Sequence, residues 1–385
     1  MSYAKTRFAE TTKILLINNT PPDINVHRRA VKLKERLCKN RLFKVDFKSK
    51  SDNIFSDFTI IFKKIMLNKY SIVHVFEPFS PTFPFLFILL KFRTKKLIYD
   101  SGDIHYLSVL TANSPLKLKV SVRFNEFLAY KCSDIVIVRG FSAKDVVPKY
   151  YNLPRESIRW IPDGVDLIKF DEADGQGIRE KHRLGSAFII GYASGIRFLR
   201  IKENLMPRGW ELLYVMDKMI KSGRDDFRLL IVGTGPALPV FIKLVKDNGY
   251  DKYVTFAGFV DNSEYAKYLR AMDVGFYESI NTPLYQVMMP TKLVEYMAAS
   301  LPILAGNIGE AKRTYNSNGI LFAPLEADFR NLDMYIDEIY HAVSFMYDNR
   351  EILRNMGKRS RQIAEKFYSW DIIASEYEKI IDENH

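Results

Sequence analysis

The sequence has few of the residues that build disulfide frameworks, metal centres or membrane spans. Its only two cysteines, Cys38 and Cys132, are too few for a disulfide framework and lack metal-site spacing. The six histidines are scattered, without the paired-histidine helix motif of zinc sites. The longest apolar run, Phe83 to Leu90, is far shorter than the roughly 20 residues that span a bilayer. The N-terminal segment also lacks the apolar stretch of a secretory signal. We therefore expect a cytoplasmic protein without a metal centre or a transmembrane segment.

The composition is that of a folded protein with a basic surface. Of the 385 residues, 47% are hydrophobic and 26% are charged, a profile typical of globular domains. The length suits two domains of ordinary size. The formal net charge of +12 favours anionic partners, which include nucleic acid, anionic lipid and phosphorylated small molecules. A surface that is merely rich in solvated lysine explains the charge equally well.

Short apolar runs alternate with amphipathic stretches along most of the chain, which is typical of parallel βαβ units. Continuous Val, Ile and Leu runs indicate strands that are covered by helices on both faces. The expected strands are Lys13–Ile17, Lys44–Phe47, Ile72–Phe76, Lys96–Tyr99, Ile135–Val138, Arg159–Ile161, Phe188–Tyr192, Arg228–Val232, Val254–Phe256, Val274–Phe276, Ile303–Ala305 and Ile320–Phe322. The expected helices include His27–Lys39, Leu116–Lys131, Trp210–Lys221, Pro236–Asp247, Glu264–Ala271 and Thr291–Ala299.

The apolar pattern lapses in a segment rich in glycine, aspartate and charge that begins at Pro162, which is the composition of a linker. We therefore expect an α/β protein of two Rossmann-like, doubly wound domains that face a cleft. The expected domains are residues 1–165 and 166–365. After about residue 328 the pattern is helical to the end of the chain.

Three segments of the second half have the composition of ligand-binding turns. An apolar strand leads into Gly233 and a second glycine in VGTGP, where glycine permits a tight turn before a helix. Phe259 and Val260 follow another strand and could flank a flat ring, or else pack in the core. Pro290 and Thr291 open a helix whose first amides form an anion site.

Two charged residues on that helix extend the anion site. Lys292 adds a cation beside the helix N-terminus, and Glu295 lies three residues on, on the same face. A carboxylate there can accept hydrogen bonds from both hydroxyls of a ribose while the amides hold a diphosphate. The alternative is a surface ion pair, which contributes little to stability.

The order of these segments resembles the retaining glycosyltransferases of family four, the group 1 type of glycosyl transferases, which have the GT-B fold. The similarity rests on IPDGVD at the domain junction, VGTGP, FAGFV, and PTKLVEYMAASLPI, and it covers about residues 160–385. The closing FYSWDII is similar to a terminal helix, here residues 366–385, which in that family crosses back to the N-terminal domain.

The resemblance implies a metal-independent enzyme without a cofactor, whose donor is a nucleotide-diphosphate sugar such as a UDP- or GDP-sugar. It implies that Glu295 holds the ribose and that Thr291 and Lys292 meet the phosphates. The family also has an arginine and a lysine after the first strand of this domain. Here Arg197 and Arg208 stand near those positions, with Arg200 and Lys202 as rivals in a longer loop. Each of these cations could instead be solvated surface charge.

The chain departs from the family at one position and matches it more loosely in the first half. Val287 stands where many members carry the first of two glutamates, so the sugar contact must come from elsewhere. The segment LIYDSGDIH is similar to the family's acceptor-side turn, which gives Asp103 and His105 as candidate catalytic residues. A turn-stabilising aspartate and a solvated histidine are the alternative. Arg29 on the first helix also matches a family position.

The expected partners are the donor and a glycan or lipid-linked acceptor, and we expect no nucleic acid. The apolar run before Lys91, Arg93, Lys95 and Lys96 has the composition of a membrane-docking helix, which would place the protein peripherally on an anionic membrane. A buried helix with a basic end is the alternative. Two other functions stay open: a nucleotide-sugar epimerase of the same fold, and a non-catalytic protein that binds polyanions or membranes.

Overall fold

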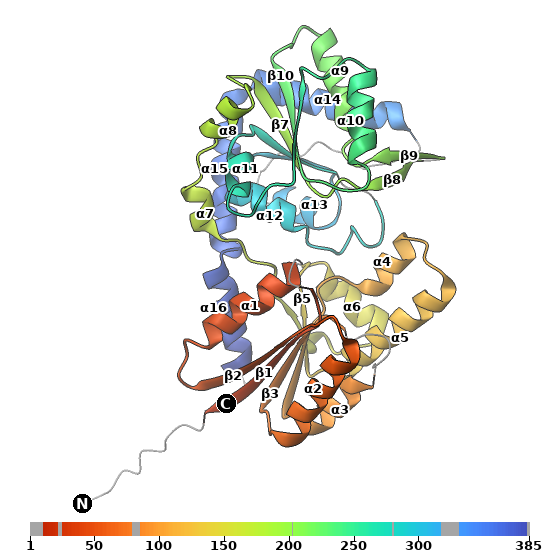
Figure 1. Cartoon of the computed structure of the whole chain (residues 1–385), viewed down its shortest axis with the longest axis vertical. Coiled ribbons are helices and arrows are strands. Elements are labelled where there is room, and N and C mark those ends of the chain that lie inside the picture. The colour runs from red at the N-terminus through yellow and green to blue at the C-terminus, as the bar shows by residue number, and fades with distance from the viewer. Residues whose placement is uncertain are drawn as a thin grey trace, which may run out of the picture. The chain divides into compact units, whose positions relative to one another are not determined.

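Figure 1 shows the computed structural model of the chain, which describes residues 11–21, 25–78, 85–201, 203–278, 281–316 and 331–382. The chain divides into two compact units. Unit 1 consists of Met1–Asp163, Val287–Met289 and Trp370–His385, and unit 2 consists of Gly164–Gln286 and Pro290–Ser369. The sequence predicted divisions after residues 165 and 365 and did not predict that Val287–Met289 belong to unit 1.

Unit 1 is built on a six-stranded sheet in the order β2-β1-β3-β4-β5-β6, in which all neighbouring strands are parallel. The strands are β1 Thr12–Asn18, β2 Phe43–Ser49, β3 Ile72–Phe76, β4 Lys96–Asp100, β5 Ile135–Val138 and β6 Ile158–Trp160. The helices are α1 Asn25–Leu37, α2 Ile54–Leu67, α3 Leu86–Arg93, α4 His105–Thr111, α5 Leu116–Cys132, α6 Ala143–Tyr151 and α16 Trp370–Asp382, with a 3-10 turn η1 at Arg155–Ser157.

Alternate residues of the unit 1 strands pack against different helices. Ile14 and Leu16 belong to a core cluster with α1 and α16, to which α16 contributes Ile373 and Tyr377. On β4, Tyr99 makes edge contacts with aromatic rings of α3 and α5. The sheet is therefore covered on both faces, which explains the continuous apolar runs of its strands.

Unit 2 contains a five-stranded sheet in the order β11-β10-β7-β12-β13, again with all neighbours parallel, and a separate antiparallel hairpin β8-β9. The strands are β7 Phe188–Ala193, β8 Phe198–Ile201, β9 Asn204–Pro207, β10 Phe227–Val232, β11 Val254–Gly258, β12 Val274–Tyr277 and β13 Ile303–Ala305. The helices are α7 Leu167–Asp171, α8 Gln176–Lys181, α9 Glu211–Lys221, α10 Leu238–Asp247, α11 Tyr265–Arg270, α12 Thr291–Ala298, α13 Gly309–Asn316, α14 Leu332–Asp348 and α15 Arg350–Phe367.

The terminal helix α16 belongs to unit 1, although it follows α15 of unit 2 in the chain (Figure 1). On α16, the Tyr377 hydroxyl lies 3.0 Å from Nε2 of His74 on β3. His74 is fully enclosed, and burial lowers its pKa to about 3, so the ring is neutral. The two Rossmann-like units and the returning helix confirm the predicted fold class.

Two segments expected to be loops contain regular secondary structure. In the segment expected to be a linker, the chain passes from unit 1 to unit 2 after Asp163. The rest of this segment folds as part of unit 2, because α7 and α8 bury Phe170 and Ile178 there. The longer loop that carries the rival cations forms the hairpin β8-β9, which the apolar pattern did not reveal. The expected strand at residues 320–322 lies outside the described residues.

Candidate functional site

Charged side chains follow the strands of unit 1 and meet at one edge of its sheet. Glu77 follows β3, Asp100 ends β4, Arg139 follows β5 and Asp163 follows β6. Arg139 lies 3.5 Å from Glu77, 3.4 Å from Asp100 and 3.5 Å from Asp163. With Arg29, these residues form what we call the unit 1 edge cluster. The carboxyl edge of a doubly wound parallel sheet is where such folds bind ligands.

Arg29 of α1 supports this cluster from within the protein. Its side chain is fully buried and donates to Asp100 Oδ2 at 2.6 Å and to the carbonyls of Pro162 at 2.6 Å and Ile161 at 3.0 Å. Burial alone would raise the pKa of Asp100, but the guanidinium groups of Arg29 and Arg139 lower it. Arg29 therefore joins α1 to the ends of β4 and β6, and its side chain is not accessible to a substrate.

Both predicted acceptor-side residues lie at the same edge. His105 is the first residue of α4, and its Nε2 contacts the Glu77 carboxylate. The His105 side chain is 36% exposed, so it is neither a fully solvated nor a core histidine. Asp103 precedes it by two residues, and burial raises the pKa of its carboxyl, against the opposing effect of Arg139. The structure thus brings Asp103 and His105 to the edge cluster.

The turn after β10 in unit 2 requires glycine for a structural reason. Gly233 has a φ of 137°, and a side chain there would put its Cβ 2.0 Å from the carbonyl oxygen of Ser194. Ser194 follows β7, and its amide donates to the Val232 carbonyl at 3.0 Å. The loops after β7 and β10 therefore run against each other at the carboxyl edge of this sheet.

The candidate cations of unit 2 differ in their surroundings. Arg197, in the loop after β7, and Arg200, on β8, are exposed, whereas Lys202 lies outside the described residues. Arg208 follows β9, is mostly buried, and forms an ion pair with Glu278, a residue that is 3% exposed. The interpretation of Arg208 as solvated surface charge is therefore wrong.

Glu278, which directly follows β12, links Arg208 to the end of that strand. Its Oε2 accepts a hydrogen bond from the Gly209 amide at 3.1 Å, and its Oε1 pairs with Arg208. Arg208 also donates to the hydroxyl of Tyr285. The arginine is thus fixed by a carboxylate and a phenol at the carboxyl edge of the unit 2 sheet.

The helix α12 begins at the same edge and places the predicted donor-binding residues. Pro290 is its N-cap and Thr291 its first residue, and Lys292 forms an ion pair with Glu295 at 2.8 Å. Tyr265 of α11 completes the group. Its hydroxyl donates to Glu295 Oε2 at 2.9 Å and accepts from Lys292 at 2.9 Å. The surface ion pair expected as an alternative exists, but it is part of a three-residue group with both charges partly buried.

The loop after β11 presents an aromatic side chain to solvent. Phe259 is 75% exposed and Val260 is half-buried. Core packing, the alternative interpretation for these two residues, is therefore wrong for Phe259. The loop leads directly into α11, whose first residue, Tyr265, contacts Glu295. This connection brings the Phe259 loop beside α12.

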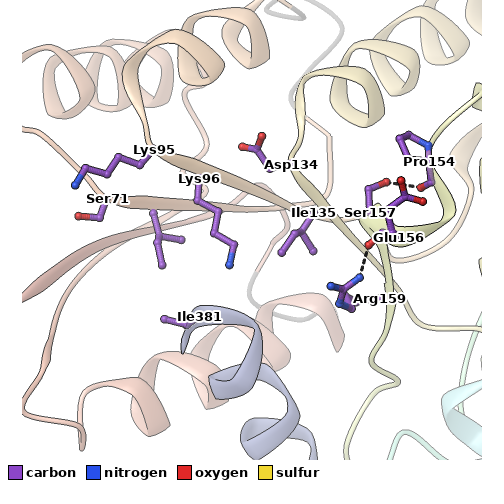
Figure 2. Close-up of a pocket in the computed structure, with 11 residues that line it drawn as sticks. Ser71, Lys95, Lys96, Asp134, Ile135, Pro154, Glu156, Ser157, Arg159 and Ile381 are labelled. Carbon is purple, nitrogen blue, oxygen red and sulfur yellow. Dashed lines mark hydrogen bonds between the residues drawn. The ribbon is translucent and has the colours of Figure 1, made fainter. Parts of the chain in front are cut away.

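A cavity of about 650 Å³ in unit 1 lies away from all of these residues (Figure 2). It is lined by Ser71, Lys96, Asp134 and Ser157, which stand at the amino ends of β3 to β6, and by Ile381 of α16. Ligands of doubly wound sheets bind at the carboxyl edge, and this cavity is at the opposite edge. It is therefore not the candidate site.

The membrane-docking segment expected around α3 is internal only in part, because Phe85, Phe92, Arg93 and Lys95 are exposed. Leu86, Phe87 and Leu90 are buried. Lys96 is also buried, and its Nζ donates to the Ile380 carbonyl at the end of α16, so its prediction as a membrane-facing cation is wrong. Lys91 pairs with Asp134. Residues 83 and 84 at the start of this run lie outside the described residues.

Sequence reasoning missed five residues of these edges: Glu77, Asp100, Arg139, Tyr265 and Glu278. Glu77, Arg139 and Glu278 each directly follow a strand and are the central residues of FEP, VRG and YES. A charged residue immediately after an apolar strand was the signal that could have identified them. Val287, which replaces the first family glutamate, is buried, so its side chain offers no polar group to a sugar.

The described part of the chain has neither a cluster of metal-binding side chains nor a membrane-spanning helix. No group of three or more His, Cys, Asp or Glu residues is arranged to hold a metal ion. No helix among these residues has the length and apolarity needed to cross a membrane.

Comparison with known proteins relates unit 2 to glycosyltransferases. Residues 209–333 match the family described as Glycosyl transferases group 1. The chain is 29% identical over 230 residues to the GDP-mannose-dependent alpha-(1-6)-phosphatidylinositol monomannoside mannosyltransferase of Mycobacterium tuberculosis. This match covers 58% of the chain and 55% of the relative, so the chain spans about half the length of that curated protein.

Solved structures with the same fold cover nearly the whole chain. The sucrose-phosphate synthase of Thermosynechococcus elongatus superposes with a TM-score of 0.71 at 19% identity, covering 97% of this chain and 98% of that one. HepE of Anabaena, in complex with UDP, superposes with a TM-score of 0.69 at 13% identity, covering 97% and 100%. The chain therefore has the GT-B fold, which confirms the predicted fold class, and residues 209–333 are similar in sequence to the group 1 glycosyl transferases.

Proposed function

We propose that the chain is a retaining, metal-independent glycosyltransferase that moves a sugar from a nucleotide-diphosphate sugar to a glycan or lipid-linked acceptor. The observation that carries this proposal is the carboxyl edge of unit 2. There a glycine turn, the start of α12 and the group of Lys292, Glu295 and Tyr265 lie within the region related to group 1 glycosyl transferases. We assign the donor to this edge.

The residues of the donor edge suit the parts of a nucleotide-diphosphate sugar. Glu295 uses Oε2 for Tyr265 and Lys292, which leaves Oε1 to accept from a ribose hydroxyl. The first amides of α12 and the Lys292 ammonium suit the diphosphate. The exposed ring of Phe259 suits stacking on the base. The compared proteins do not identify the nucleotide base of the donor. The mannosyltransferase is named for GDP-mannose, whereas HepE was solved with UDP.

Charge stabilisation of the leaving diphosphate supplies the main catalytic effect in this proposal. Cations and amides placed at the developing negative charge stabilise the transition state more than the ground state. Arg197 is exposed in the loop after β7, and Arg208 is fixed by Glu278 and Tyr285 at the same edge. These two arginines are our candidates for the leaving-group contact.

The acceptor is assigned to the edge cluster of unit 1. Asp103 and His105 are the partly accessible polar residues beside the buried Arg29 and Arg139. A lipid-linked acceptor is in keeping with the relative from Mycobacterium tuberculosis, whose name gives a phosphatidylinositol monomannoside as its acceptor.

A test of the donor assignment is a thermal-shift screen of nucleoside diphosphates and their sugar conjugates. A ligand at 100 times its Kd stabilises the folded state by about 2.7 kcal/mol, which moves the melting temperature measurably. Incubating the best donor with candidate acceptors and analysing the products then tests transfer. An epimerised nucleotide sugar would point to the epimerase, and no stabilisation by any nucleotide would favour the non-catalytic protein.

An anionic membrane is the surface partner that the helices of unit 1 suit best. On α5, Leu116, Val120, Phe124 and Phe127 recur at the spacing of one helical face, and all four are exposed. We call them the α5 face. Exposed cations lie within the same helix, at Lys117 and Arg123. An apolar helix face flanked by basic residues is typical of helices that lie in the membrane interface.

Liposome co-sedimentation tests this surface. Replacing Val120 and Phe124 with serine should reduce binding to vesicles of anionic lipid, whereas the same replacement of Phe345, an exposed residue of α14, should not. Each basic residue near such a surface contributes about 1 kcal/mol and is screened by salt, so binding should also fall at high ionic strength. If the wild type stays in the supernatant at low salt, the acceptor is soluble.

A further inference from the structure

Glu77 has a backbone conformation that side chains rarely adopt. Its φ is 63°, in the left-handed region, which costs a residue with a Cβ about 1–2 kcal/mol. Two hydrogen bonds hold it there: its amide donates to the Asp100 carbonyl at 3.0 Å, and its carbonyl accepts from Asn19 Nδ2 at 2.9 Å. The neighbouring turn also leaves space for its carboxylate. A Cβ at Gly102 would lie 2.0 Å from Glu77 Oε1.

The carboxylate held in this way contacts His105. Glu77 Oε2 meets His105 Nε2, and Glu77 Oε1 faces Arg139 at 3.5 Å. The backbone of His105 is fixed separately, because its amide and that of Tyr106 both donate to the carboxylate of Glu126 on α5. The ring and the backbone of one partly exposed histidine are therefore each held by a buried carboxylate.

We propose that Glu77 is a positioning residue, which keeps Nε2 of His105 turned inward so that Nδ1 donates a hydrogen bond to an acceptor hydroxyl. The proposal rests on the assignment of the acceptor to unit 1. Among the described residues no hydrogen bond to Nδ1 is present, and the side chain is 36% exposed, so this nitrogen is the one that an acceptor can reach. A histidine fixed at one nitrogen by a carboxylate has a defined hydrogen-bonding role at the other.

The charge of the imidazole follows from the groups that face it. These are Glu77 after β3, Glu126 of α5 and Asp103 in the preceding turn, while Arg139 after β5 pairs with the other oxygen of the Glu77 carboxylate. Burial alone would lower the pKa of His105, but the Glu77 carboxylate outweighs that effect and raises the pKa to about 9. At neutral pH both ring nitrogens then carry protons. The ring acts as a hydrogen-bond donor and not as a base.

The pH dependence has a definite sign. The pair of His105 with Glu77 stabilises the fold fully below the unfolded-state pKa near 6.5, and this stabilisation is lost as the pH rises through about 9. In the same range Nδ1 loses its proton and becomes an acceptor, so affinity for the acceptor substrate should fall. In a Glu77→Gln variant, this fall in acceptor affinity should occur at a lower pH.

Histidine NMR of the full chain tests the proposal without any substrate. The chain has six histidines, and the His105 imidazole resonance is the one missing from His105→Gln. We expect it to titrate near pH 9 in the wild type, at least one pH unit lower in Glu77→Gln, and in between in Glu77→Asp. Glu211→Gln is the matched control, because Glu211 is a buried glutamate of unit 2, and it should leave His105 unchanged.

A second variant covers the case in which Glu77→Gln does not fold. Gly102→Ala keeps Glu77 but puts a methyl group where Glu77 Oε1 lies. The methyl group should displace the carboxylate from His105 and thereby lower the pKa of the His105 imidazole. The proposal would be overturned if the folded variants had the same His105 pKa as the wild type. It would also be overturned if the His105 pKa in the wild type were the ordinary value near 6.5.

Kinetics separate this inference from the proposed function. Glu77→Gln should raise the KM for the acceptor about tenfold, the effect of losing one hydrogen bond to a charged group, and should leave the Kd of the donor unchanged. A tenfold change in donor Kd with an unchanged acceptor KM would contradict the role of Glu77. If no donor supports transfer at all, the proposed function fails, while the NMR titration still decides whether Glu77 positions His105.

Discussion

Replacing Glu295 with alanine should weaken donor binding strongly and change stability little. Glu295 Oε2 already accepts from Tyr265 at 2.9 Å and from Lys292 at 2.8 Å, so the carboxylate is oriented before any ligand binds. A hydrogen bond to a charged group contributes about 1.5–3 kcal/mol. Loss of one such bond to the ribose corresponds to a roughly 10- to 150-fold higher Kd.

The effect on stability is much smaller because the ion pair is partly exposed. The side chains of Lys292 and Glu295 are 30% and 20% exposed, and such pairs contribute about 0–1 kcal/mol. The unfolding free energy should therefore fall by no more than about 1 kcal/mol, plus the lost bond to Tyr265. The large loss of affinity must then come from the ligand contact and not from unfolding.

Isothermal titration with the donor nucleotide measures the affinity, and denaturant unfolding measures the stability. Glu365→Ala is the matched control, because Glu365 pairs with Arg361 at 2.8 Å on the surface of α15 in the same unit. Its donor Kd should equal that of the wild type. Wild-type affinity in Glu295→Ala would refute the ribose assignment, and equal losses in both variants would show that the effect is not specific to the site.

Three further predictions concern the base, the edge cluster and metal ions. Phe259→Ala should raise the donor Kd by a factor that corresponds to about 1–3 kcal/mol of stacking, while Phe345→Ala should not; equal affinities in titration calorimetry would exclude stacking. Arg29→Met leaves the Asp100 charge buried without its closest partner and should cost about 3–5 kcal/mol in denaturant unfolding, whereas Arg36→Met, at a surface pair, should cost under about 1 kcal/mol. Excess EDTA should leave turnover unchanged; a loss that a divalent ion restores would disprove the metal-independent mechanism.

Much of the fold was predictable because the strands are continuous apolar runs. Ile72–Phe76, Ile135–Val138 and Ile303–Ala305 have the expected bounds to the residue. These strands are enclosed on both faces, so burial alone fixes their composition. The hairpin β8-β9 could not be predicted in the same way. Phe198 and Leu205 are exposed although they are apolar, so apolar residues in these short strands do not alternate with polar ones as they do in a half-buried strand.

The sequence predicted where several site residues lie, but not which side chains contact them. The resemblance pointed to Lys292, Glu295 and His105, and all three lie at the carboxyl edge of a sheet. Their partners could not be inferred, because Tyr265 is 30 residues from Glu295 and Glu77 is 28 residues from His105 in the chain. Spacing within one helix gives a pair such as Lys292 and Glu295. A pair that joins two separate elements depends on the sheet order, which the sequence does not state.

The two sheet edges differ in how they use their charges, and this difference supports the assignment of donor and acceptor. In the unit 1 edge cluster, Arg29 and Arg139 are buried against the carboxylates of Glu77, Asp100 and Asp163. His105 adds a third positive charge, and each of these three cations already faces at least one carboxylate of the edge. An edge whose charges are already satisfied suits a neutral hydroxyl group better than a dianion.

The unit 2 edge keeps positive charge available to a ligand. Within the described residues, Arg197 and Arg200 are exposed and have no ion-pair partner, and Lys292 is partly exposed at the start of α12. Helix amides add to that positive field. A diphosphate entering here would gain charge-assisted hydrogen bonds from these three cations without breaking the buried pair of Arg208 with Glu278. The same ligand at unit 1 would have to compete with the carboxylates of the edge cluster for Arg139, which costs the energy of breaking a buried network. The electrostatics of each unit therefore favour the diphosphate at unit 2 and the accepting hydroxyl at unit 1.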